Sequence, residues 1–322
     1  MLVFFHVEYI WNFYFYQDGN VEVEIRLTGV LQVYVAGPDE PTPHGTTVAP
    51  GINAHYHQHI FSLRIDPMLD GLQNSVIESE VVGIDHPKGS AENFAGNGFV
   101  IKDRVLKSQV EDGARDFEWA TERRWRIANL NRTHYSSGKP SSYQIVMKGG
   151  AVPLLAKQDS WIAQRASFAH KQLWVVKDEE GPRGSRLFPS GKYVSQTRAE
   201  PKDSVGKWVK EGQGSIENED ILLFLTLGGT FLLSHYLWAC VDLHFQGRHI
   251  SPVQKTGLCT SVDPRCLLKS EPLLHSMPVE HVNVLFKPSS FFIQNPALDV
   301  PGTQDPQSRP AFANGTSACC RN

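Results

Sequence analysis

The chain has 322 residues, of which 41% are hydrophobic and 20% charged, enough for one large globular domain. Its formal net charge of −3 provides no basic surface, which argues against nucleic acid as a partner. The sequence opens without a basic segment and small-residue cleavage site, so we expect no secretory signal peptide.

The first element expected is a β-hairpin over residues 9–34. Strand-forming residues, many of them aromatic, fill 9–16, and Gln17-Asp18-Gly19-Asn20 is typical of a turn. Over 21–27, hydrophobic residues alternate with charged ones, which predicts one buried face and one solvent-exposed face. The Pro-, Gly- and Thr-rich residues 36–51 are expected to form a loop.

Further short strands are expected along the chain, separated by Gly, Pro, Asn and Ser clusters. They cover residues 55–66, 76–83, 98–107, 117–128, 143–148 and 172–177. Helical turns are expected only within 150–170. The apolar segment 221–241 is long enough to span a bilayer, but we favour a buried strand at 221–227 followed by an apolar insertion. The pattern predicts a mainly antiparallel β domain.

The sequence His57-Gln58-His59 lies at the start of the strand expected at 55–66. Residues i and i+2 of a strand project to the same face, so both imidazoles can reach one metal ion. Copper and zinc favour imidazole nitrogen. The same spacing also occurs where two histidines only form hydrogen bonds in a core.

The histidine motif continues as His-Gln-His-Ile-Phe-Ser-Leu-Arg-Ile-Asp-Pro-Met-Leu-Asp-Gly over 57–71. This stretch resembles the strand of copper amine oxidases that carries two of their three copper-binding histidines. Other segments that resemble the fungal-like members, in the family's order, are 15–29, 45–51, 173–176, 188–196, 218–221, 277–280 and 291–301. The resemblance implies a large antiparallel β-sandwich of the copper amine oxidase catalytic-domain type, incomplete at its N-terminus.

The resemblance also implies a reaction. Family members use copper and topaquinone to oxidise primary amines with dioxygen, yielding an aldehyde, ammonia and hydrogen peroxide. Topaquinone derives from a tyrosine of the chain itself, and an aspartate acts as the catalytic base. Members are homodimers, which implies a second copy as partner.

Two departures from the family affect this chemistry. The topaquinone tyrosine belongs to an Asn-Tyr-(Asp/Glu)-Tyr motif, which His6-Val7-Glu8-Tyr9 replaces here. Val7 has no ring to hydroxylate, so topaquinone is not expected to form, and the family's catalytic aspartate would lie upstream of this sequence. The third copper histidine should follow Thr226-Leu-Gly-Gly-Thr230, but Phe231 stands next.

An atypical segment at about 231–269 interrupts the resemblance. It contains His235, the histidine nearest in sequence to the expected third copper ligand, although a loop histidine without a role is favoured. We therefore interpret 1–301 as a partial catalytic domain with this insertion, and 302–322 as a loose tail. Both departures are explained either by an error in the gene model or by a degenerate gene.

A peripheral calcium site is also implied by the resemblance. Its ligands would be the carboxylates of Asp66 and Asp220 and the carbonyls of Pro67 and Ile221, since oxygen ligands suit a hard cation. Met68 stands where the family often has a carboxylate. Alternatively, Asp66 is only a turn residue.

Two hypotheses remain open alongside a membrane-anchored form. The chain represents a primary amine oxidase that as written is inactive, or it is a non-catalytic β remnant that binds copper weakly or pairs with an intact subunit. A cytoplasmic or peroxisomal location is favoured, although the terminal Arg321-Asn322 is no Ser-Lys-Leu signal.

Overall fold

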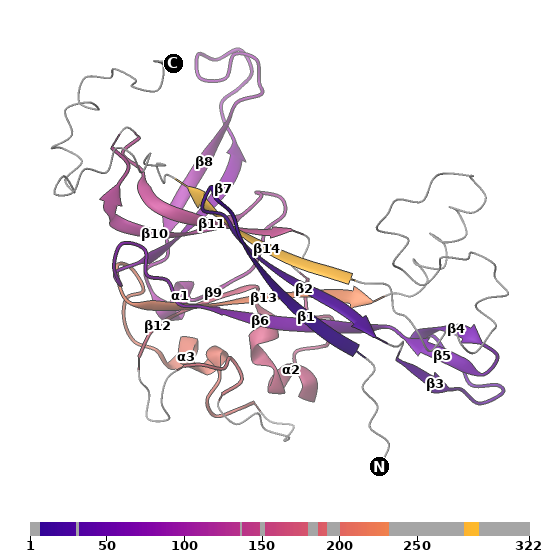
Figure 1. The fold of residues 1–322 in the computed structure, drawn as a ribbon. Helices are drawn as coiled ribbons and strands as arrows, with labels where there is room; N and C mark the ends of the chain where they lie inside the picture. Colours follow the sequence, from indigo (N-terminus) through magenta and orange to yellow (C-terminus); the bar gives the residue numbers. More distant parts are fainter. Residues whose placement is uncertain are drawn as a thin grey trace.

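The structure is a computed structural model that describes residues 7–29, 32–135, 137–148, 152–179, 186–191, 200–231 and 280–289. Its main body is a pair of antiparallel sheets packed face to face, with helices α2 and α3 on the outer side of the smaller sheet (Figure 1). This architecture confirms the mainly antiparallel β-sandwich. The predicted insertion at 231–269 and tail at 302–322 fall almost wholly outside the described residues and stay predictions.

The larger sheet has seven strands in the order β1-β2-β14-β11-β10-β7-β8. The strands are β1 (Val7–Phe15), β2 (Val21–Gly29), β14 (Glu280–Ser289), β11 (Pro140–Lys148), β10 (Arg124–Thr133), β7 (Ser75–Gly83) and β8 (Phe99–Val105). The β1–β2 hairpin closes at Gly19, whose φ of 82° lies in the region that glycine tolerates best. Strand β14 lies between β2 and β11, so the C-terminal resemblance that begins near Met277 leads into the middle of this sheet.

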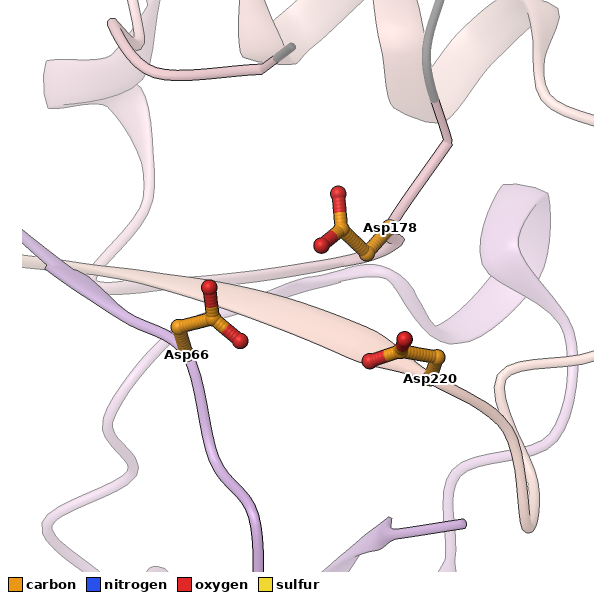
Figure 2. A group of neighbouring side chains, drawn as sticks. All are labelled: Asp66, Asp178 and Asp220. Atoms are coloured by element: carbon orange, nitrogen blue, oxygen red, sulfur yellow. The ribbon is translucent and has the colours of Figure 1, made fainter. Parts of the chain in front are cut away.

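The smaller sheet has four strands in the order β6-β13-β12-β9. They are β6 (His57–Ile65), β13 (Ile221–Phe231), β12 (Leu173–Lys177) and β9 (Ala114–Arg115). At one end of this sheet, β6 leads into Asp66, β12 into Asp178, and Asp220 leads into β13 (Figure 2). A separate three-stranded sheet comprises β3 (Val33–Val35), β5 (Ile52–His55) and β4 (Gly45–Ala49).

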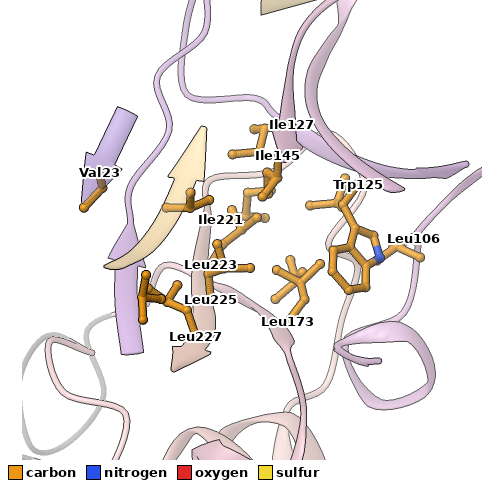
Figure 3. Packing of buried hydrophobic residues seen from close by; sticks show 14 of the residues in the cluster. Val23, Leu106, Trp125, Ile127, Ile145, Leu173, Ile221, Leu223, Leu225 and Leu227 are labelled. Atoms are coloured by element: carbon orange, nitrogen blue, oxygen red, sulfur yellow. The ribbon is translucent and has the colours of Figure 1, made fainter. Parts of the chain in front are cut away.

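The hydrophobic core fills the space between the two sheets (Figure 3). Alternate residues of β13 face the larger sheet, where they meet buried residues of β2, β10, β11 and β14. Those facing residues include Val23, Ile25, Leu27, Trp125, Ile127, Ile145, Val282 and Val284, opposite Ile221, Leu223, Leu225 and Leu227. The predicted burial of the apolar residues in 21–27 is thus confirmed.

The other face of the smaller sheet is covered by helix α3 (Val205–Glu211). Leu222 and Phe224 of β13 and Trp174 and Val176 of β12 pack against Val205 and Val209. Because both faces of β13 are buried, nearly every residue from 221 to 227 is apolar. The sequence analysis predicted this strand but not α3. Within the described ranges, the other short α-helices are α1 (Gln109–Asp112) and α2 (Trp161–Arg165), and α2 is followed by the 3-10 turn Ser167–His170.

Helices α1 and α3 lie outside 150–170, so the expectation of helical turns only in that range was wrong. Other expectations were also wrong. The charged face of β2 is not wet: Glu22 and Glu24 are only 8% and 6% exposed. Their carboxylates accept hydrogen bonds from the hydroxyls of Tyr16 (2.8 Å) and Tyr14 (2.7 Å), which cover them. Residues 36–51 are also not a simple loop, because Gly45–Ala49 pairs with β5 as strand β4. None of the helices in the described part of the chain is long and apolar enough to cross a membrane.

Candidate metal centres at the two ends of the β6–β13 strand pair

The histidine pair lies at the start of β6, where that strand pairs with the end of β13. The register places Phe231 opposite His57 and Gly229 opposite His59. One residue earlier, a Cβ on Gly228 would overlap the carbonyl oxygen of His59 and lie 3.1 Å from the Cα of Ile60. Position 228 therefore requires glycine so that the two backbones can approach closely beside the histidines.

Both imidazoles lie on one face of β6, as the spacing predicted. Their ring centroids are 4.8 Å apart and their planes are inclined by 79°. The Nδ1 atom of His57 lies 2.9 Å from the carbonyl oxygen of His55, and that of His59 lies 2.8 Å from the hydroxyl of Tyr9. In metal sites, a hydrogen bond at one ring nitrogen keeps the hydrogen on that nitrogen and leaves the other to bind the metal. Metal binding by these rings would therefore use Nε2.

Burial of His59 also favours the neutral ring. Desolvation, and secondarily the charge of His57, lowers the pKa of His59 to about 4. A neutral imidazole keeps the lone pair that a metal requires, so His59 is a competent ligand near neutral pH.

Gln58 points to the opposite face of β6 and connects three segments. Its Nε2 donates to the carbonyl oxygen of Pro153 (3.0 Å) and to Oγ1 of Thr230 (2.9 Å). Its Oε1 accepts from the backbone N–H of Leu155 (2.9 Å). These bonds fasten the end of β13 to β6 next to the histidine pair.

The set of ligands is incomplete among the described residues. No third His, Cys, Asp or Glu there forms a three-residue group with His57 and His59. His235 lies outside the described residues. Val7 begins β1, with its Cα opposite Gly29, two residues before the Tyr9 that contacts His59. The two imidazoles supply part of a copper site, since copper favours this ligand type.

A second candidate site lies at the far end of the same strand pair. Carboxylate oxygens of Asp66, Asp178 and Asp220 lie within 4.8 Å of one another (Figure 2). The sequence analysis identified Asp66 and Asp220 but missed Asp178. The signal available was its place directly after the buried strand Leu173–Lys177, which contains the segment 173–176 that resembles the family. Met68, where the family often has a carboxylate, is 71% exposed.

The loop after Asp66 is held in place by Asn74. Its side chain accepts from the N–H of Leu69 (3.0 Å) and donates to the carbonyl of Gly71 (2.9 Å). Its backbone pairs with Glu219, beside Asp220, and the N–H of Asp178 donates to the carbonyl of Asp220 (2.8 Å). These backbone contacts bring the three aspartates together. Pro67 and Ile221 are both buried next to them in the chain.

The electrostatics of this cluster are unfavourable without a cation. Burial, followed by the charges of Asp178 and Asp66, raises the pKa of Asp220. Its Oδ1 is buried and accepts no hydrogen bond. Arg64 offsets part of the repulsion, with Nη2 3.1 Å from Asp66. An orphaned oxygen among three carboxylates fits a hard cation such as calcium.

The fold and these sites define an antiparallel β-sandwich that presents a histidine pair at one end and a carboxylate cluster at the other. A model of the copper amine oxidase enzyme domain matches residues 6–252. This chain is 36% identical over 315 residues to a peroxisomal primary amine oxidase of Pichia angusta, covering 98% of the chain and 38% of that protein. It is 34% identical over 300 residues to copper amine oxidase 1 of Schizosaccharomyces pombe, covering 92% and 36%.

Solved structures agree. A copper-containing benzylamine oxidase from Hansenula polymorpha superposes with a TM-score of 0.69 at 29% identity, covering 93% of this chain and 40% of that one. An Aspergillus nidulans amine oxidase, at 16% identity, shows the same fold with a TM-score of 0.66, covering 92% and 34%. The chain belongs to the copper amine oxidase family, and it spans less than half the length of these relatives.

Proposed function

We propose that this chain is a copper-binding segment of a primary amine oxidase catalytic domain, with His57 and His59 as two copper ligands. The observation that carries the proposal is the histidine geometry: two adjacent rings with both Nδ1 atoms held by hydrogen bonds. The family's oxidative deamination of primary amines by dioxygen is the reaction we assign to the whole protein. Family membership and the relatives' names support it.

His235 is our candidate for the third ligand. The last described residue of strand β13 is Phe231, whose Cα is paired with that of His57. Four further residues reach at most ~13 Å, which is enough to return a side chain to the site.

The chain as written is proposed to bind copper without forming topaquinone. Topaquinone would supply an electron sink for amine oxidation that no ordinary side chain provides. Its precursor needs a phenol ring, and the aliphatic Val7 stands at that position. His57 and His59 would hold the metal, while Tyr9 and Gln58 fix the geometry around it.

Copper titration of the purified chain, with phenylhydrazine labelling of the product, tests this proposal. We expect the wild type to bind one Cu(II) and the His57→Ala/His59→Ala variant to lose that binding. Neither should show a quinone absorbance with phenylhydrazine. Equal copper binding by both proteins would refute the ligand assignment, and a phenylhydrazine adduct would refute the statement about Val7.

The carboxylate cluster is proposed as a calcium site. Asp66 and Asp220 stay the ligands expected from the sequence, together with the carbonyls of Pro67 and Ile221. Asp178 supplies a third carboxylate, in place of the one absent at Met68. The raised pKa of Asp220 supports the proposal. Burial, followed by the charges of Asp178 and Asp66, disfavours its ionised form, and a bound cation would offset both causes.

A second candidate function is that of a non-catalytic subunit that pairs with another copy or with an intact oxidase. The β7–β8 hairpin extends away from the sandwich (Figure 1). On it, Phe94, Phe99 and Ile101 are 81%, 68% and 63% exposed, as is typical of a surface that binds a partner. Light scattering of the chain, alone and mixed with an intact oxidase, tests this. If the chain stays monomeric in both samples, this function is ruled out.

The compartment stays a prediction. The Pichia angusta relative is named as peroxisomal, which supports the cytoplasmic or peroxisomal location expected from the sequence.

A further inference from the structure

Tyr9 connects the two sheets of the sandwich at the histidine pair. It comes from β1, an edge strand of the seven-stranded sheet, whereas His59 comes from β6, an edge strand of the four-stranded sheet. Its hydroxyl lies 2.8 Å from Nδ1 of His59. Its ring also meets those of His59 and Phe61 edge to face, with centroids 5.6 Å and 5.4 Å away.

The two histidines are held by different means. His57 is 2.9 Å from the carbonyl of His55, so its orientation is set within two residues of the same chain segment. His59 is held by a residue 50 positions away in the sequence. The hydrogen bond at Nδ1 of His57 is therefore local to its own chain segment, whereas that at Nδ1 of His59 depends on the packing of β1 against β6.

We propose that Tyr9 is the positioning residue for His59 as a copper ligand. When Nε2 of His59 provides the lone pair, Nδ1 carries the hydrogen, and the phenol oxygen of Tyr9 accepts it. This bond fixes both the tautomer and the rotation of the ring. Such outer partners of metal-bound histidines are typically worth 10- to 100-fold in metal affinity. The inference rests on the proposed copper binding by His57 and His59.

The alternative is that Tyr9 only packs as an aromatic ring. The change Tyr9→Phe separates the two roles, because it keeps the ring contacts with His59 and Phe61 and removes only the hydroxyl. Tyr14→Phe is the matched control. It removes a hydroxyl from the same strand, one that donates to Glu24 (2.7 Å) rather than to a histidine.

The experiment measures Cu(II) affinity of the full chain by competition with a chelator, together with the Cu(II) EPR spectrum. We expect Tyr9→Phe to weaken binding about 10- to 100-fold and to change the nitrogen hyperfine pattern. Tyr14→Phe should stay within about twofold of the wild type. Thermal unfolding without metal checks that both variants fold.

A double-mutant cycle distinguishes positioning from general destabilisation. With only His59 left, in the His57→Ala background, Tyr9→Phe should still weaken copper binding. With only His57 left, in the His59→Ala background, it should have no further effect. Equal losses in both backgrounds, or wild-type affinity in Tyr9→Phe, overturn the role of Tyr9 while the copper site stands. If His57→Ala/His59→Ala binds copper like the wild type, the proposed function fails first.

Discussion

The two ends of the β6–β13 strand pair carry different chemistry on one scaffold. At one end, imidazoles of His57 and His59 stand beside the last residues of β13. At the other, Asp66 and Asp220 flank the same two strands and meet Asp178 from β12. About seven residues separate the ends, or ~23 Å at the usual rise of a strand.

The two ends differ in the additional strand that each one contacts. The histidine end depends on β1 of the opposite sheet, through the contact between Tyr9 and His59. The acidic end depends on β12 of the same sheet, through the backbone bond between Asp178 and Asp220. We therefore expect the histidine end to respond to how the two sheets pack, and the acidic end to respond to cations and pH.

The largest effect is expected at Gly228. The change Gly228→Ala forces a Cβ into the carbonyl oxygen of His59, so β6 and β13 must separate. We expect a loss of about 3 kcal/mol in the free energy of unfolding, at the upper end for overpacking, and weaker copper binding. Urea denaturation and copper titration measure the two effects.

Gly83→Ala is the control for that variant. It lies at the end of β7, where an added Cβ meets no atom within 4 Å. If Gly228→Ala changes stability no more than Gly83→Ala, the close approach of the strands is not needed for the histidine end.

A smaller effect is expected from Asp220→Asn, which changes the acidic end alone. Calcium should stabilise the wild type by about 2.7 kcal/mol at roughly one hundred times its Kd, and should not stabilise the variant. Without calcium, the variant should be the more stable protein, because it lacks a charge that burial and the charges of Asp178 and Asp66 disfavour, the causes that raise the Asp220 pKa. Thermal unfolding with calcium or with a chelator measures this.

Copper affinity is the control for the acidic end. Asp220→Asn should leave it unchanged if the two ends are independent. A calcium-induced stabilisation that persists in the variant would contradict the site.

Asp220 and the buried Glu78 have pKa values shifted in opposite directions, so they should contribute to stability with opposite pH dependences. Glu78 is 2% exposed; burial alone would raise its pKa, but hydrogen bonds from Arg115, Arg104 and Trp125 lower it from 4.5 to about 2. The stabilisation from Glu78 is thus present above pH 4.5 and is lost as pH falls towards 2. The contribution of Asp220 has the opposite sign: it is present below pH 3.8 and lost as pH rises through its raised pKa.

Measuring the free energy of unfolding from pH 2 to 7 tests these signs. The deficit of Glu78→Gln against the wild type should shrink below pH 4.5, whereas the advantage of metal-free Asp220→Asn should grow as pH rises. Parallel curves for the wild type and Glu78→Gln would show that the arginine cluster does not lower the Glu78 pKa.

The sequence predicted most strands because their pattern is local. The turn at Gly19 and the apolar run of β13 are readable from neighbouring residues alone, and so is the spacing that puts His57 and His59 on one face. Helix α3 was missed because its seven residues carry a weak periodic signal, and packing on Trp174 and Phe224 stabilises it. The exposure of Glu22 and Glu24 was predicted wrongly because Tyr14 of β1 and Tyr16, just after β1, donate hydrogen bonds to their carboxylates.

The sequence by itself determined the family, the strand pattern and the identity of the paired histidines, since these depend on residue types at fixed spacings. The tertiary structure decided which distant residues complete each end: Tyr9 beside His59, and Asp178 beside Asp66 and Asp220. The physical reason is that both contacts depend on sheet packing and strand order. These bring together residues that no local pattern relates.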